Sequence, residues 1–216
     1  MEGRAEVGRR PMKTGSLSAA IPCAAAGIHA AAAFAMLLVI SPAADPGIPL
    51  PARIDWFVGH RELWQASWIC WMLGALSLIA FYGWWGTRTA SRRVTGIAVV
   101  TAVLGACFDL TWEARLVAAN RDNVVEVLRG AGFWTTVFAN GFYCIAGVIL
   151  TVVTPGLPWW LRAWTWAIWI VGFGMSAAGA VQWMPGIKIT TGVITVLLVP
   201  WFVVLGRFLK TSTAPA

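Results

Sequence analysis

Two carboxylates stand four residues apart in the segment CFDLTWEARL (107–116), which is otherwise apolar enough for a lipid bilayer. On an α-helix, Asp109 and Glu113 are about 40° apart and one turn from each other. Ala102 and Ala106 extend the same face, and small residues mark a surface that another helix approaches closely. We therefore expect both acids to point into a helix bundle. Two carboxyl groups this close do not ionise together easily, which is typical of a proton- or cation-binding site.

The same pair is also compatible with a structural role. Hydrogen bonds near the water boundary, with Arg53, Arg61 or Arg129 supplied by outer loops, would fix the packing of the helix. Arg115 lies about 160° from Asp109 around the helix. We expect its side chain to extend to the lipid headgroups instead of pairing with that acid.

His29 lies near the middle of the first long apolar segment, on a face that consists mostly of Ala. An imidazole at this depth can relay protons or bind a metal, whereas a neutral His bonded to a neighbouring helix has only a structural role. Haem held by two His would require a second deep His. His60 precedes the second apolar segment, so we do not expect bis-His haem.

Five small or polar residues share one face of a later apolar segment: Thr136, Asn140, Cys144, Gly147 and Thr151. Such a seam suits hydrogen bonds between helices, and it can also line a cavity.

The segment DWFVGHRELWQ (55–65) places several polar groups just before the second apolar segment. Asp55, His60 and Glu62 could ligate a hard metal or act as an acid–base pair. Their spacing matches no HExxH or comparable signature, so we predict no metal site there.

The candidate residues fall into two groups by expected depth. Ligand- or proton-binding candidates are Asp109, Glu113, His29, Asn140, Trp112 and Gln65. Candidates at an outer mouth are His60, Glu62 and Asp55. The sequence identifies no catalytic residue and no cofactor.

The composition is that of an integral membrane protein. Of 216 residues, 59% are hydrophobic and 12% charged, about half the charged fraction of a soluble domain. The mean hydropathy is +0.73. The chain has 15 Trp and 2 Tyr, and Trp favours the membrane–water boundary. Four Cys lie in different apolar segments without a CxxC motif, so no disulfide framework is expected.

We predict an all-α bundle of about six transmembrane helices, since a spanning helix needs about 20 apolar residues. The expected spans are about 17–41, 63–84, 94–117, 133–153, 161–182 and 188–207. A short interfacial helix is expected at about 122–130, ended by Gly130 or Gly132. These elements form one transmembrane domain over 16–210, between a basic tail at 1–15 and a C-terminal tail at 211–216.

The basic residues cluster at the ends of these spans, which indicates topology and argues against nucleic acid as a partner of this chain of net charge +7. With the N-terminus inside, ten Lys and Arg lie on the cytoplasmic side and six outside, where most acids also lie. We predict a multi-pass protein of the cell (inner) membrane with both termini cytoplasmic. A cleaved signal peptide is the alternative, but the first apolar run of roughly 25 residues exceeds the usual h-region.

Three functions remain open. The polar residues favour binding or transport of a small ligand or protons through an outward-opening polar cavity. A membrane-embedded enzyme acting on a lipid or a quinone-like substrate, or a structural subunit of a larger membrane complex, are the alternatives. The chain is short for a complete carrier, so we expect a homo-oligomer or other membrane subunits besides the lipid bilayer. No P-loop, GxGxxG or HExxH motif is present.

Overall fold

The computed structural model describes residues 17–89 and 91–211, and the regular secondary structure of these residues is all helical. The α-helices are α1 (Leu17–Ala35), α2 (Ser41–Ala44), α3 (Leu50–Gly59), α4 (Arg61–Gly86), α5 (Arg92–Ala118), α6 (Val124–Phe133), α7 (Asn140–Val153), α8 (Trp159–Ala180) and α9 (Met184–Thr211). Two π-helical turns, η1 (Met36–Ile40) and η2 (Trp134–Ala139), join α1 to α2 and α6 to α7 without a break.

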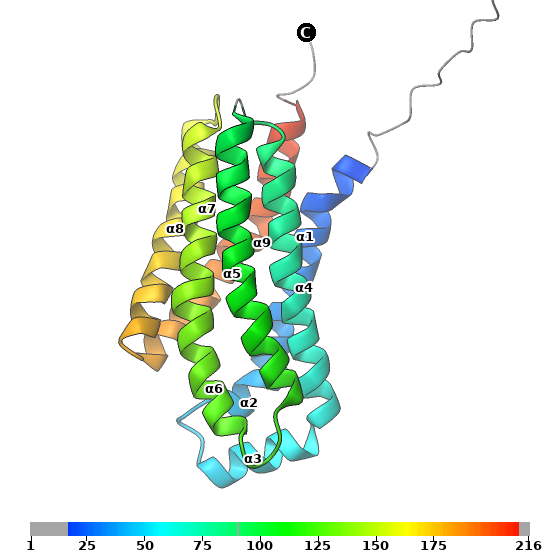
Figure 1. Ribbon diagram of the computed structural model, residues 1–216, viewed down its shortest axis with the longest axis vertical. Coiled ribbons are helices and arrows are strands. Elements are labelled where there is room, and N and C mark those ends of the chain that lie inside the picture. Colours follow the sequence, from blue (N-terminus) through cyan, green and yellow to red (C-terminus); the bar gives the residue numbers. More distant parts are fainter. Residues whose placement is uncertain (1–16, 90, 212–216) are drawn as a thin grey trace, which may run out of the picture.

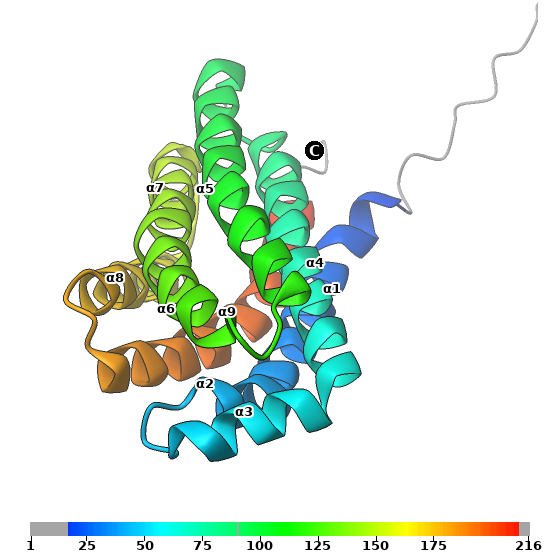
Figure 2. The same cartoon turned by 60° about the horizontal axis from the view of Figure 1, so that its bottom comes forward.

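Six long segments form a closed ring. Going around it, α1 packs on α4, α4 on α5, α5 on α7, α7 on α8, α8 on α9, and α9 back on α1. Figure 1 shows the segments running roughly along the long axis, and Figure 2 shows α2 and α3 lying across one end. Because the ring closes, every long segment faces a common centre.

Five segments are long and apolar enough to cross a membrane: Ala20–Ala44, Arg61–Gly86, Arg92–Ala118, Val124–Val153 and Met184–Thr211. The sixth expected span, α8, lies in the same ring between α7 and α9. Its 22 residues include five Trp, whose polar indole N–H lowers the hydropathy of the helix. The multi-pass, all-α membrane class is therefore supported, while a sixth crossing stays a prediction.

The segments that connect the predicted spans are more helical than expected. The helix predicted at about 122–130 does not end at Gly130 or Gly132 but continues through η2 into α7. Gly130 lies against the ring of Trp112, where any Cβ would collide with it. Close packing thus explains this glycine better than a helix end does. The proline-rich stretch after α2 leads into α3.

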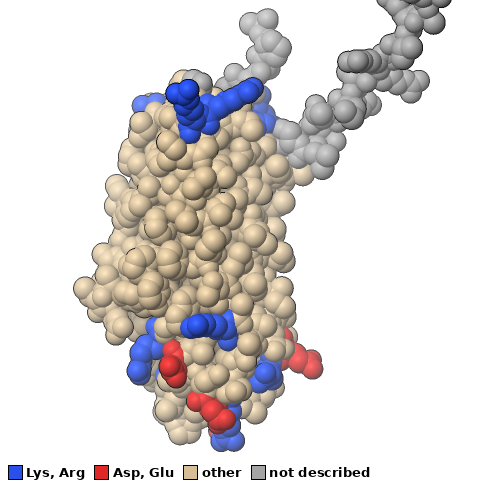
Figure 3. Space-filling view, in the orientation of Figure 1, with Lys and Arg blue, Asp and Glu red and all other residues tan. Residues whose placement is uncertain are grey.

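Charge is distributed differently at the two ends of the bundle (Figure 3). Where α4, α7 and α9 end, the described ionisable residues are all basic: Arg88, Arg92, Arg93, Arg162, Arg207 and Lys210. We call this the basic end. The opposite, mixed-charge end carries five acids, Asp45, Asp55, Glu62, Asp122 and Glu126, among its Arg and Lys residues. A broad uncharged band separates the two ends.

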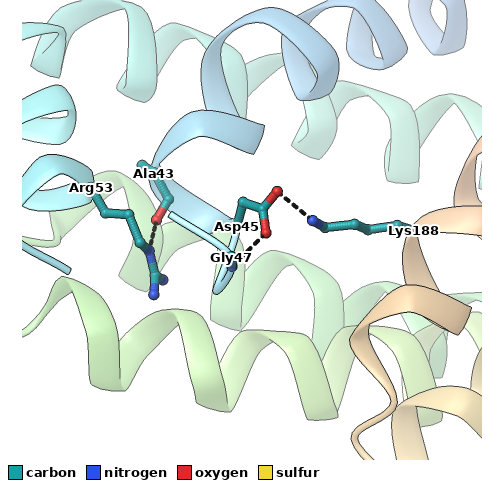
Figure 4. A network of polar contacts seen from close by, with 5 residues as sticks. All are labelled: Ala43, Asp45, Gly47, Arg53 and Lys188. Carbon is teal, nitrogen blue, oxygen red and sulfur yellow. Dashed lines mark hydrogen bonds and ion pairs between the residues drawn. The ribbon is translucent and has the colours of Figure 1, made fainter. Parts of the chain in front are cut away.

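At the mixed-charge end, an ion pair ties the loop after α2 to the start of α9 (Figure 4). Asp45 Oδ2 lies 2.6 Å from Lys188 Nζ. Asp45 Oδ1 accepts a 2.8 Å hydrogen bond from the Gly47 backbone N–H. Beside it, Arg53 Nε donates to the Ala43 carbonyl at 2.7 Å. The hydrogen bonds from Lys188 and Gly47 hold the pKa of the Asp45 carboxyl below its usual value.

Two apolar clusters fill the ring. One lies towards the basic end and includes Phe81, Trp85, Trp201 and Phe202, which are fully buried. The other lies towards the mixed-charge end and includes the buried residues Phe57, Trp64, Trp68 and Leu116. Although Trp favours the membrane–water boundary, Trp64 and Trp68 are only 1% and 8% exposed and lie inside the bundle. Their indole rings pack in the buried cluster at the mixed-charge end.

Candidate functional site

A cavity of about 190 Å³ lies where the two apolar clusters meet. All six long segments contribute to its wall. The polar and aromatic residues that line it are His29, Trp68, Trp71, Tyr82, Asp109, Glu113, Thr135, Thr136, Asn140, Tyr143, Trp169, Thr191 and Thr195. The rest of the wall is mainly aliphatic or sulfur-containing. Asp109, Glu113 and His29, which lie far apart in sequence, thus share one cavity.

The acids come from α5, on the face where Ala102 and Ala106 are fully buried, as their spacing predicts. Glu113 is only 3% exposed, and its Oε2 has no hydrogen-bond partner. By helical rise it lies about 8 Å from the end of α5 at the mixed-charge end, and about 30 Å from the basic end. The cavity acids therefore lie nearer the mixed-charge end.

Among the described residues, no Lys or Arg balances these acids. The cavity wall, as far as the chain is described, contains no Lys or Arg. Arg53 bonds to the Ala43 carbonyl, and the one ion pair within residues 17–89 and 91–211 joins Asp45 to Lys188. The structural alternative, in which an outer Arg pairs with Asp109 or Glu113, is not observed.

Tyr143 of α7 is a wall residue that the sequence analysis missed. Its phenol lies next to the Asp109 carboxyl, but its hydroxyl makes no hydrogen bond of good geometry. Its backbone carbonyl accepts a 3.0 Å hydrogen bond from the hydroxyl of Tyr82 on α4. The chain has only two Tyr, and both line the cavity. In a Trp-rich chain, this scarcity is the signal that could have identified them.

His29 of α1 faces the same space. Its Nδ1 lies 2.9 Å from the Ala25 carbonyl, so Nδ1 carries the proton and Nε2 is left as an acceptor. Ser77 Oγ of α4 lies 3.5 Å from Nδ1, and the Phe202 ring packs 4.9 Å from the imidazole centroid. His29 is thus held mainly by its own helix, with little polar contact to its neighbours.

Asn140 lines the cavity, but its amide group serves the seam between α7 and α8. Asn140 Nδ2 donates to the Gly172 carbonyl at 2.6 Å and to Ser176 Oγ at 2.9 Å. Ser176 Oγ in turn donates to the Thr136 carbonyl at 2.8 Å. The polar face predicted on this segment is therefore largely an interhelical hydrogen-bond seam.

Trp68 and Trp71 form an indole pair on the α4 wall. Both line the cavity, and the Nε1 of each is buried without a hydrogen-bond partner.

Both π-helical turns also contribute to the cavity wall, since Met36 of η1 and Thr135 and Thr136 of η2 line the cavity. Single π-turns within α-helices are frequent at functional sites.

The other candidate residues lie outside the cavity wall. Gln65 donates through Nε2 to the Val117 carbonyl at 3.0 Å and thereby caps the end of α5. Trp112 lines a separate surface depression, with Arg115 over its ring at 4.6 Å. His60 stacks on Trp56 at 3.8 Å and bonds to its carbonyl. Glu62 and Asp55 are exposed at the mixed-charge end.

Among the described residues, no group of three or more His, Cys, Asp and Glu side chains converges as a metal site would require. The carboxyl pair could hold a proton or a single cationic group.

Comparisons with protein-family models, curated proteins and solved structures give no significant match. The function must therefore be argued from the cavity.

Proposed function

We propose that this protein binds a small ligand in the central cavity and moves that ligand or protons across the membrane. One observation carries the proposal: Asp109, Glu113 and His29 line a single cavity inside a bundle of membrane-like helices. Ionisable groups at such depth are expensive, and in membrane proteins they mark ion pathways and proton relays.

The absence of a basic partner in the described wall strengthens the argument. Two carboxylates without a counter-charge carry an uncompensated desolvation penalty. Binding of a proton or a cation removes that penalty. A structural pair would be expected to have its own hydrogen-bond or ionic partners, which Glu113 Oε2 lacks.

The same reasoning gives the direction of access. The aromatic residues Phe81, Trp85, Trp201 and Phe202 fill the ring on the basic side of the cavity. Glu113 lies nearer the mixed-charge end. If the basic end faces the cytoplasm, as the positive-inside rule predicts, Glu113 lies nearer the outer surface, and a ligand from outside would reach it past the second apolar cluster. We propose the cell (inner) membrane as its location, because the difference in charge between the two ends fits the positive-inside rule.

The alternatives have weaker support. A cavity of about 150 Å³ holds benzene, so about 190 Å³ suits a molecule of similar size better than a lipid or sterol. An enzyme acting on a small substrate fits the same cavity, but no arrangement of nucleophile and base distinguishes it. A purely structural subunit would not require unpaired acids in a cavity.

The direct test is dissipation of a pH gradient, or ligand-driven pH change, in proteoliposomes that contain the full chain. We expect the Asp109→Asn/Glu113→Gln double variant to lose most of the activity. The Glu62→Gln variant is the matched control, because it removes an exposed carboxylate from the same end. A double variant as active as the unaltered protein, with both correctly folded, would remove the proposal.

A further inference from the structure

Three buried polar atoms without hydrogen-bond partners belong to the wall of this one cavity: Glu113 Oε2, Trp68 Nε1 and Trp71 Nε1. Tyr143 lines the same wall, and its phenol lies next to the Asp109 carboxyl. Glu113, Tyr143 and Trp68 are 3%, 8% and 8% exposed. Buried polar groups in folded proteins are nearly always paired. A cluster of unpaired groups from two helices, α4 and α5, therefore indicates that a ligand supplies their partners.

The charge of the cavity wall indicates whether the ligand is an anion, a neutral molecule or a cation. Asp109 and Glu113 offer carboxylate oxygens, and an anion would meet both of them with no Lys or Arg in the described wall to balance it. A neutral molecule would leave uncompensated any carboxylate charge that a bound proton does not neutralise. A cation would be held by charge-assisted hydrogen bonds, which are roughly twice as strong as neutral ones.

The aromatic residues of the cavity wall favour binding of an organic cation over binding of a metal ion. A bare ion needs several hard ligands to replace its water, and the described residues hold no cluster of three. The indoles of Trp68 and Trp71 and the phenol of Tyr143 instead offer electron-rich faces. Such faces attract ammonium groups within about 6 Å of a ring centroid.

The volume sets an upper limit on size. At about 190 Å³ the cavity is somewhat larger than the cavity of about 150 Å³ that holds benzene. It therefore fits one ring, or an aliphatic body of equal size, together with a charged nitrogen. The two indole N–H groups can only donate, so an acceptor oxygen on the ligand would pair with them.

We propose that the cavity recognises a small organic ammonium ion, with its nitrogen against the carboxyls of Glu113 and Asp109, its apolar body against the faces of Trp68 and Trp71, and an acceptor oxygen, where it has one, at their N–H groups. This assignment rests on the proposed function, because it names the ligand of the same cavity.

The test compares three probes of nearly the same shape and different charge: benzylamine, which is protonated at neutral pH, benzyl alcohol and benzoate. Binding is measured by equilibrium dialysis on the full chain in nanodiscs. We expect saturable binding of benzylammonium alone. Glu113→Gln is expected to weaken it by at least about tenfold, and Glu62→Gln to leave it unchanged. Thermal melting of each variant confirms that it is folded.

A second variant separates recognition of the body from recognition of the charge. Trp68→Phe keeps an aromatic face but removes the indole N–H, and we expect a smaller loss than with Glu113→Gln. Trp160→Phe, at an exposed indole on α8, is its matched control.

Equal saturable binding of benzyl alcohol and benzylammonium would overturn the ammonium assignment and leave the cavity as a binding site. Absence of saturable binding of all three probes would also overturn it. In that case the proteoliposome test decides the proposed function separately, because it depends on proton movement and not on these probes.

Discussion

At the residue scale, the side chains that bind helix to helix are distinguishable from those left free for a ligand. Trp64 Nε1 and Gln65 Nε2, neighbours on α4, donate to the carbonyls of Leu116 and Val117 at 2.8 and 3.0 Å. These are among the last carbonyls of α5, which have no partner within the helix. The amide nitrogen of Gln65 therefore caps the end of α5. The unpaired atoms of Glu113 and its cavity neighbours have no comparable structural task.

Three buried Trp residues of the core pair their indole N–H groups with side chains. Three indoles donate to Thr hydroxyls on neighbouring helices at 2.9 Å: Trp85 to Thr154, Trp169 to Thr151, and Trp201 to Thr165. Each of these Thr hydroxyls also donates to the carbonyl four residues earlier in the chain. A Trp therefore brings a large apolar area and a satisfied N–H into the bundle. Trp68 and Trp71, by contrast, have no such Thr.

The Asp45–Lys188 pair leads to a prediction about pH. The pKa of Asp45 is lowered in the folded protein, so its contribution to stability is fully present above the unfolded value of about 3.9. The contribution is lost as the pH falls through the folded pKa. Asp45→Asn keeps an oxygen for the Gly47 N–H and removes the charge. We expect it to lower stability by up to about 1 kcal/mol at neutral pH, because the pair is partly exposed.

The measurement is the melting temperature in detergent of the unaltered chain and the Asp45→Asn variant, taken from neutral to acidic pH. The two should converge below the folded pKa of Asp45. Lys188→Gln should behave in the same way, since it removes the other half of the pair. A difference that stays constant with pH would show that the ion pair is not its source.

At the element scale, α7 and α8 approach more closely than any ordinary side chain would allow. Gly147 lies against the Trp169 ring, Gly172 against Cys144, and Gly179 against Thr136. The seam combines this close approach with the hydrogen bonds of Asn140 and Ser176, as in other membrane helix pairs. Since both helices line the cavity, their spacing also fixes its width.

Gly147→Ala should therefore destabilise the bundle. The added Cβ would collide with the Trp169 ring, which is held by its hydrogen bond to Thr151 and has little freedom to move. Overpacking of this kind costs about 1–3 kcal/mol. Gly141→Ala, on the same helix, is the matched control, because its nearest neighbour would be Ser176 Oγ at 3.8 Å. There we expect no loss, or a small gain from helix propensity. Equal melting temperatures of the two variants would contradict close packing at Gly147.

The sequence predicts those features of the fold and of the cavity that depend on a local residue pattern, and it does not predict those that depend on contacts between distant segments. The 3.6-residue period placed Asp109 and Glu113 on the buried face of α5, and it placed the seam of α7 correctly. Whether Gln65 or His60 lies near that face depends on how α3 and α4 are joined, which no local pattern encodes. Tyr143 was missed for the same reason. Its role follows from a neighbour 34 positions earlier in the sequence, Asp109, which only the ring of helices brings beside it.

At the scale of the whole molecule, the ring and the charge distribution together define an axis with two different ends. The cavity is closed towards the basic end by a fully buried aromatic cluster, and its acids lie towards the mixed-charge end. A ligand that enters from the mixed-charge end, past the second apolar cluster, would therefore meet Glu113 before it meets the aromatic cluster at the basic side. This asymmetry gives the proposed function a direction, provided that the orientation is as predicted.

The orientation can be tested with single added cysteines and a membrane-impermeant thiol reagent. Glu62→Cys lies at the mixed-charge end and should be labelled in intact cells, whereas Arg92→Cys at the basic end should be labelled only after permeabilisation. The native Cys23 and Cys107 are exposed on the bundle surface, but within apolar spans. Lipid around these spans should keep a membrane-impermeant reagent from reaching them. The unaltered chain is the control for this background. Labelling of Arg92→Cys but not Glu62→Cys in intact cells would show that the topology is the opposite of the predicted one. The acids would then lie nearer the cytoplasmic side.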